Sequence, residues 1–118
     1  MTYSPTKTLS FDEFIAQYGD DFRYELADGE LIDMEPTGPH ETVGGKLLVQ
    51  IGIAITQAQH PWFIPRTCLI RPFSDTVTAR RPDIVVLDEA MLSHEPRWEQ
   101  EPVITLGRSI KLLSLIHI

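Results

Sequence analysis

The feature that most constrains this chain is an Asp-Gly pair between two short runs of alternating polar and apolar residues, FRYELA and ELIDME. A two-residue hairpin turn needs positive φ at both central positions, and Asp28-Gly29 tolerates this well. The pattern predicts a β-hairpin over 22–35. The pairs expected across it are Leu26 with Leu31 and Glu25 with Ile32.

Two helices are predicted on either side of this hairpin. The first covers about 10–18, because Ser10 and Glu13 have the spacing of a capping box and aromatic residues follow at helical spacing. The second covers about 41–59, after the loop PTGPH at 36–40. Its apolar stripe predicts burial against a sheet or a partner helix, so a homo-oligomer is one open arrangement. The stripe consists of Val43, Leu47, Ile51, Ile55 and Ala58.

Short runs typical of strands fill most of the remaining chain. They are WFIP (62–65), CLIRPF (68–73), PDIVVL (82–87) and VITLG (103–107). The polar stretch 74–81 predicts a hairpin tip, and 88–102 predicts a long loop. Helices mixed with strands in this order indicate an α/β or α+β sandwich with a mixed sheet.

Composition narrows the class of protein. The length of 118 residues suits one domain. The net charge of −7 favours an acidic globular domain over a DNA-binding surface, which is usually basic. It does not exclude an enzyme acting on nucleic acid, because Mg²⁺ sites are built from carboxylates. The single cysteine, Cys68, excludes an internal disulfide and suits a cytoplasmic location. We expect no membrane span and no signal peptide.

Three residues are candidates for chemistry. Asp83 starts an apolar strand and could ligate a hard cation there. Alternatively, it caps a turn or forms a surface pair with Arg80 or Arg81. Glu25 lies mid-strand and points either at water or at a metal. His40 precedes the second predicted helix, where it either orients a water or a phosphate or simply begins the helix.

Three segments in order resemble the Uma family of putative restriction endonucleases. They are YELADGEL (24–31), His40 before a helix, and RPDIVV (81–86). The resemblance spans about residues 8–105. It implies the PD-(D/E)XK nuclease fold, a restriction-endonuclease-like mixed sheet with flanking helices and a Mg²⁺ site at the sheet's edge. It also implies DNA as the partner.

The same resemblance assigns roles to the candidate residues. Asp83 matches the motif aspartate that binds metal, Glu25 matches the upstream acidic residue near the metal, and His40 matches the recurrent histidine. The implied catalytic set is therefore Asp83, Glu25 and His40, with Asp83 and Glu25 as metal ligands. Because both would approach one cation, we expect their carboxylates within roughly 8 Å of each other.

The chain departs from the family's pattern after the aspartate, where a strand with Glu-Val and then a lysine are expected. No carboxylate follows Glu101, and Lys111 precedes the expected glutamate position. We therefore expect a tail at 1–9 and the N-terminal part of one nuclease domain at 10–112. We expect 113–118 to be a truncated or non-native ending, and the chain to lack nuclease activity.

Two further expectations complete the analysis. The alternation over 110–115 predicts a strand that pairs beside 82–87. The alternative to a nuclease is a non-catalytic protein-interaction module with a nuclease-like fold, which would use its apolar long helix for contacts. A stretch with no stable function of its own is a third hypothesis.

Overall fold

The computed structural model describes residues 8–71 and 77–114. The helices are α1 (Phe11–Tyr18) and α2 (Gly38–Ala58), with 3₁₀ turns η1 (Glu89–His94) and η2 (Gly107–Ser109). The strands are β1 (Tyr24–Ala27), β2 (Glu30–Asp33), β3 (Trp62–Phe63), β4 (Leu69–Ile70), β5 (Ile84–Asp88), β6 (Val103–Ile104) and β7 (Ile110–Ser114). The predicted mixture of helices and strands is confirmed.

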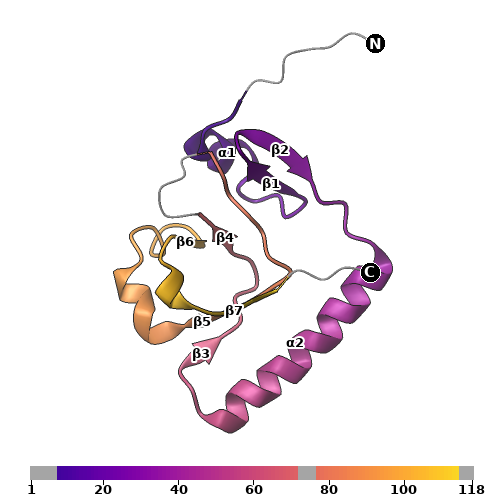
Figure 1. The fold of residues 1–118 in the computed structure, drawn as a ribbon, viewed down its shortest axis with the longest axis vertical. Helices are drawn as coiled ribbons and strands as arrows, with labels where there is room; N and C mark the ends of the chain where they lie inside the picture. The colour runs from indigo at the N-terminus through magenta and orange to yellow at the C-terminus, as the bar shows by residue number, and fades with distance from the viewer. Residues whose placement is uncertain (1–7, 72–76, 115–118) are drawn as a thin grey trace.

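The described strands form three small sheets, and β5 is the central strand of the largest one (Figure 1). The hairpin β1-β2 is antiparallel, β5 lies between β3 and β7, and β4 pairs with β6 in parallel. The first four residues of β5 are buried, as its apolar run predicts. The predicted pairing of the 110–115 region beside β5 is confirmed through Ser114, with Val86 opposite Leu112.

The N-terminal helix and the hairpin follow the sequence closely. Leu26 lies opposite Leu31, and both turn residues have positive φ, 50° at Asp28 and 82° at Gly29. The predicted capping box of α1 is present at Ser10. One hydrophobic core joins α1 to the hairpin, β4 and β6. Its buried members are Leu9, Phe11, Phe14, Leu26, Leu69, Ala79 and Val103.

Helix α2 begins earlier than predicted, inside the segment expected to be a loop. Thr37 is its N-cap, and the Thr37 hydroxyl oxygen accepts a hydrogen bond from the His40 amide at 3.2 Å. Pro39 lies in the first turn, where its missing amide hydrogen costs nothing. The segment 36–40, with its two prolines and a glycine, therefore leads into and begins the helix rather than forming a loop. The helix ends at Gln59, whose φ of 58° is left-handed.

The predicted burial of the α2 stripe is wrong. No residue of this helix is buried, and Val43 and Leu47 are exposed, while Ile51 and Ile55 are half-buried. Figure 1 shows α2 running along one side of the molecule with no described element on its outer side. An apolar stripe is buried only where a second layer covers it, and for much of α2 that layer is missing among residues 8–71 and 77–114.

Two segments differ from the loops expected for them. Within 74–81, residues 74–76 lie outside the described residues, but Ala79 pairs with Leu26 and Arg80 pairs with Ile70. The polar stretch therefore ends in a strand-like bridge between the hairpin and β4. The segment 88–102 contains η1, so it is not irregular throughout. The expected tail at 1–9 and ending at 113–118 lie mostly outside the described residues.

Glu95, which follows η1, is a buried carboxylate that the sequence did not single out. Its Oε1 accepts hydrogen bonds from the amide and hydroxyl of Thr105 at 2.8 and 3.1 Å. Its Oε2 accepts from the Leu106 amide at 3.1 Å and the Ser109 hydroxyl at 2.6 Å. These bonds hold the turn between β6 and β7, so Glu95 sets the entry of β7 beside β5.

Within the described ranges, no helix is both long and apolar enough to cross a membrane.

Candidate functional site

The three candidate residues lie on one cavity of about 960 Å³, although they are far apart in the sequence. The cavity lies between the hairpin, the first turns of α2 and the segments around 66–68 and 81–83. Glu25 comes from β1, His40 from the first turn of α2, and Asp83 from the residue before β5. The tertiary structure thus brings together three residues, although Glu25 and Asp83 are separated by about half the length of the chain.

Asp83 and His40 are in direct contact. His40 Nε2 lies 2.8 Å from Asp83 Oδ1, and because a carboxylate only accepts, Nε2 carries the hydrogen. The Asp83 amide donates to the carbonyl of Ser114 at 3.1 Å, which ties this residue to the end of β7. The other ring nitrogen, His40 Nδ1, is buried without a hydrogen bond in the described chain, 3.5 Å from Glu41 Oε1.

Glu25 does not face solvent, so that alternative is wrong. Its side chain is 7% exposed, and each carboxylate oxygen accepts a hydrogen bond. Oε1 accepts from Arg80 Nη1 at 2.7 Å, and Oε2 accepts from the Arg81 amide at 3.0 Å. Glu25 therefore anchors the two residues that lead into Pro82 and Asp83. Arg80, which was one suggested partner of Asp83, pairs with Glu25.

Arg81 is the residue that the sequence analysis missed, because it was considered only as a surface ion-pair partner. Its guanidinium is buried and donates to the carbonyls of Tyr24, Tyr18 and Gly19, at 2.6, 3.2 and 3.1 Å. Burial lowers the pKa of Arg81. A signal was present in the sequence: the last turn of α1 has no basic residue, so its free carbonyls need donors from elsewhere.

The carboxylates suit a hard divalent cation in type but are few in number. Mg²⁺ sites use one or two carboxylates and several waters, which matches Asp83 and Glu25. Across residues 8–71 and 77–114, however, no group of three His, Cys, Asp or Glu residues has the arrangement of a metal site. Glu25 would have to exchange its bond to Arg80 for a cation. Lys111 lies 3.8 Å from Asp88, at the opposite end of β5 from Asp83.

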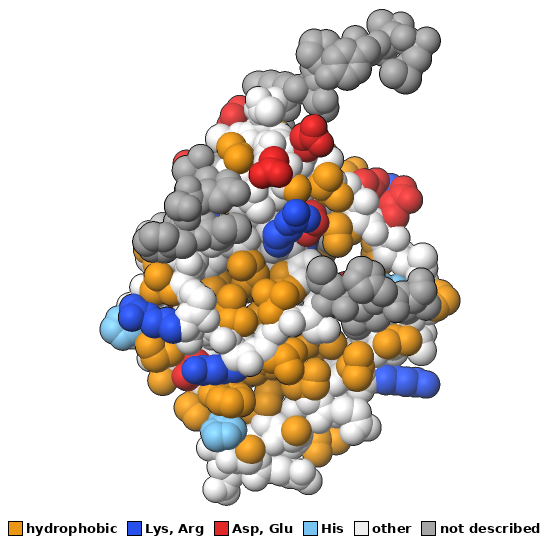
Figure 2. Space-filling model, in the orientation of Figure 1, with side chains coloured by type: hydrophobic (Ala, Val, Ile, Leu, Met, Phe, Trp, Pro, Cys, Tyr) orange, Lys and Arg blue, Asp and Glu red, His pale blue; other side chains and the backbone are white. Residues whose placement is uncertain are grey.

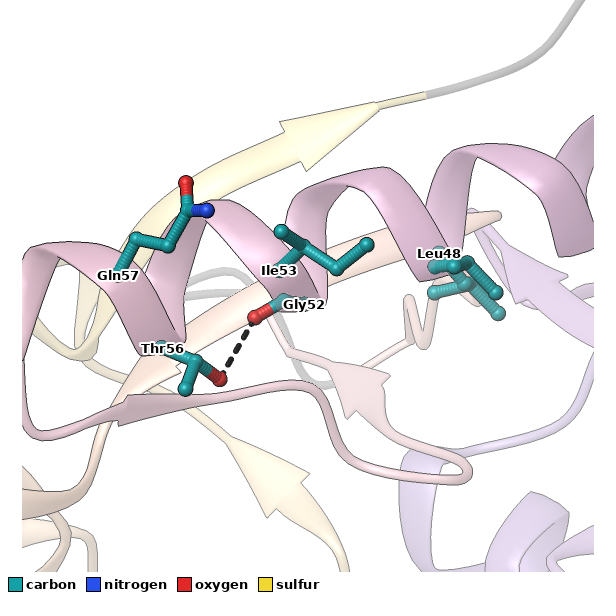
Figure 3. A pocket seen from close by; sticks show the side chains of 6 residues that line it. Leu48, Gly52, Ile53, Thr56 and Gln57 are labelled. Atoms are coloured by element: carbon teal, nitrogen blue, oxygen red, sulfur yellow. Dashed lines mark hydrogen bonds between the residues drawn. The ribbon is translucent and has the colours of Figure 1, made fainter.

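A second hollow lies along α2 and has no acid–base chemistry. It has a volume of about 440 Å³ and is lined by Leu48, Val49, Gly52, Ile53, Thr56 and Gln57. Figure 3 shows Leu48, Gly52, Ile53, Thr56 and Gln57 along the helix, with the Thr56 hydroxyl donating to the Gly52 carbonyl at 2.9 Å. Because no lining residue is titratable, the catalytic candidates remain those of the larger cavity.

The comparison with protein families assigns the chain. Residues 11–106 match the model of the Uma2 family, whose description is putative restriction endonuclease. The chain belongs to this family. The match covers the hairpin, α2 and β5, and therefore every wall of the cavity that holds Asp83. The mixed α/β architecture is consistent with a restriction-endonuclease-like fold, and membership in the Uma2 family indicates a nuclease function. No curated protein and no solved structure matched the chain.

Proposed function

We propose that the cavity lined by Glu25, His40 and Asp83 is the site of a metal-dependent endonuclease, which hydrolyses phosphodiester bonds in DNA. The observation that carries the proposal is the convergence of these residues on one cavity, with His40 and Asp83 in contact at 2.8 Å. Family membership supports it independently. Asp83 and Glu25 would hold Mg²⁺, as the resemblance implied.

Each residue has a distinct task in this proposal. Mg²⁺, when bound, would lower the pKa of a water and offset charge on the scissile phosphate. His40 donates to Asp83 and so fixes the orientation of that carboxylate. Glu25, through its bond to the Arg81 amide, holds the turn that presents Asp83 to the cavity. The buried guanidinium of Arg81 locks the same turn against α1 and β1.

We also propose that the 118-residue chain binds the cation weakly and does not cleave DNA. Strand β7, one of the two neighbours of β5, has the sequence IKLLS and carries no carboxylate. Its lysine, Lys111, pairs with Asp88 at the far end of β5 and so does not serve as the motif lysine beside Asp83. With one or two carboxylates engaged, the cation would rely mostly on water for its remaining ligands.

Mn²⁺ titration followed by electron paramagnetic resonance tests the metal site, with plasmid cleavage measured in parallel. We expect weak Mn²⁺ binding by the wild-type chain, its loss in Asp83→Asn, and no cleavage by either. Asp12→Asn is the matched control, because it removes an exposed carboxylate outside the cavity. Equal binding by wild type and Asp83→Asn would contradict the metal site. Cleavage that Asp83→Asn abolishes would contradict only the proposed inactivity.

A second candidate function, a protein-interaction module, is favoured by the exposure of α2. Val49 is 61% exposed and Ile53 is 48% exposed, although both are large and apolar. Figure 2 shows hydrophobic side chains gathered on the half of this face where α2 and the three-stranded sheet lie. We propose that this surface joins two copies of the chain. Sedimentation velocity tests this, since Val49→Lys with Ile53→Lys should then shift a dimer to monomer, whereas Gln50→Lys should not.

A further inference from the structure

We propose that Arg66 is a phosphate-binding residue of the cavity, whose guanidinium contacts a backbone phosphate of the nucleic acid. This inference rests on the proposed nuclease function and adds a residue that neither the sequence motifs nor the family resemblance pointed to. Its basis is the distribution of charge around the cavity and the place of Arg66 in the strand pairing.

The cavity needs a cationic side chain that is not already paired if a nucleic acid strand, which is anionic, is to enter it. Its lining contains the carboxylates of Glu25, Glu35, Glu41 and Asp83. A phosphodiester backbone adds one negative charge per nucleotide, so protein–nucleic acid contacts are made mainly by Arg and Lys on phosphates. The overall charge of −7 makes any local positive group more important for binding.

The cavity is lined by Arg23, Arg66 and Arg81, and two of them are committed to other partners. Arg23 forms a bidentate ion pair with Asp33, with hydrogen bonds of 2.6 and 2.7 Å, and donates a further hydrogen bond to Glu35 at 2.8 Å. Arg81 is buried and donates to backbone carbonyls. The Arg66 side chain is exposed and has no hydrogen bond or ion pair within the described residues. Its planar donors therefore remain available for a phosphate.

The flanking strand pairs place Arg66 near Asp83. Phe63 pairs with Leu87, and Ile70 pairs with Arg80, both in antiparallel register. Counting inward one residue at a time from either pair sets Arg66 opposite Ile84 and the next residue opposite Asp83. The ladder is interrupted between these two pairs, and the chain bends at 66–67. The interruption coincides with the cavity, whose lining includes both Arg66 and Asp83.

Fluorescence anisotropy with a labelled DNA duplex, in Mg²⁺ and at several NaCl concentrations, tests the proposal. Arg66→Ala should weaken binding roughly tenfold at low salt, the scale of one charge-assisted hydrogen bond. The slope of log affinity against log salt should fall by about 1, because one phosphate contact is lost. Arg66→Lys should restore most of the affinity, since it keeps the charge.

Arg108→Ala is the matched control, because Arg108 is an exposed arginine of η2 outside the cavity. It removes the same charge, so it should leave the affinity close to that of wild type. Equal weakening by Arg66→Ala and Arg108→Ala would overturn the proposal, since only the net charge would then matter. If the wild-type chain binds DNA and Arg66→Ala binds it equally tightly, only the role of Arg66 is overturned. If the wild-type chain binds no DNA at any salt concentration, the proposed nuclease function itself is overturned.

Discussion

The two α-helices in the described part of the chain have similar sequence signals and opposite environments. In α1, Phe11 and Phe14 are completely enclosed by the hairpin and its neighbouring strands. In α2, which is more than twice as long, no residue is buried and Val49 is largely exposed. Helical spacing of apolar residues thus predicted both helices correctly, but it predicted burial for only one. Burial depends on what other elements cover a face, and that information is not local.

The largest effect should come from α1. Replacing Phe14 by Ala removes a ring that is 0% exposed, so we expect unfolding free energy to fall by about 3–5 kcal/mol. Urea denaturation followed by circular dichroism measures this. The control is Phe22→Ala, which removes the same ring from a 62% exposed position and should cost about 1 kcal/mol or less. Equal losses would show that the exposed ring is covered in solution.

A smaller effect is expected at Glu95, on the side of the molecule where β7 enters the sheet. Glu95→Gln keeps the shape but turns an amide nitrogen toward groups that now donate to a carboxylate. We expect a loss of about 1–3 kcal/mol, because a buried donor loses its acceptor. Glu99→Gln, at an exposed position outside this network, should change stability by less than about 0.5 kcal/mol. A neutral result at Glu95 would mean that the turn before β7 is held by other contacts.

Cys68 should make stability depend on alkaline pH. Burial, with a contribution from nearby Glu95, raises the pKa of the Cys68 thiol to about 12. In the unfolded chain the thiol ionises near its ordinary value of 9.0, so the unfolded state alone loses the proton above that pH. The protonated Cys68 thiol therefore contributes fully to the free energy of unfolding below pH 9. This contribution declines as pH rises, by about 1 kcal/mol between roughly pH 9 and 10.

The measurement is a series of urea unfolding curves at increasing pH for wild type and Cys68→Ala. The variant should lose less stability per pH unit than wild type does, whatever its stability at neutral pH. Parallel pH dependences would contradict the raised pKa. Slow reaction of the folded protein with a thiol reagent, compared with the urea-unfolded chain, provides an independent check.

The smallest effect is expected on the outer face of α2. Val49→Ala should change the unfolding free energy by no more than about 0.5 kcal/mol, because the side chain is already exposed. Alanine also has the better helix propensity, which offsets part of the lost apolar contact. This expectation applies to the isolated chain; a loss above about 1 kcal/mol that grows with protein concentration would instead support the dimer proposed for this face. The comparison between the two helices would then hold only for the isolated chain.

The candidate site was partly predictable from sequence. The resemblance named Asp83, Glu25 and His40, and all three line one cavity. Their roles as catalytic and metal-binding residues stay predictions, as does the separation of roughly 8 Å expected between the two carboxylates. What the sequence could not indicate was that Glu25 would be held by Arg80 and Arg81.

The sequence by itself determined the elements that depend on neighbouring residues. The Asp28-Gly29 turn, the capping box of α1 and the apolar run of β5 each rest on local backbone preferences, and each formed as predicted. Only the tertiary structure decided which faces are covered and which charges meet. Arg81 reaches carbonyls 57 to 63 residues away, and such partners depend on chain packing rather than on sequence spacing. For the same reason the exposure of α2, and the lack of a partner for the Arg66 guanidinium within the described residues, could not be predicted from sequence spacing.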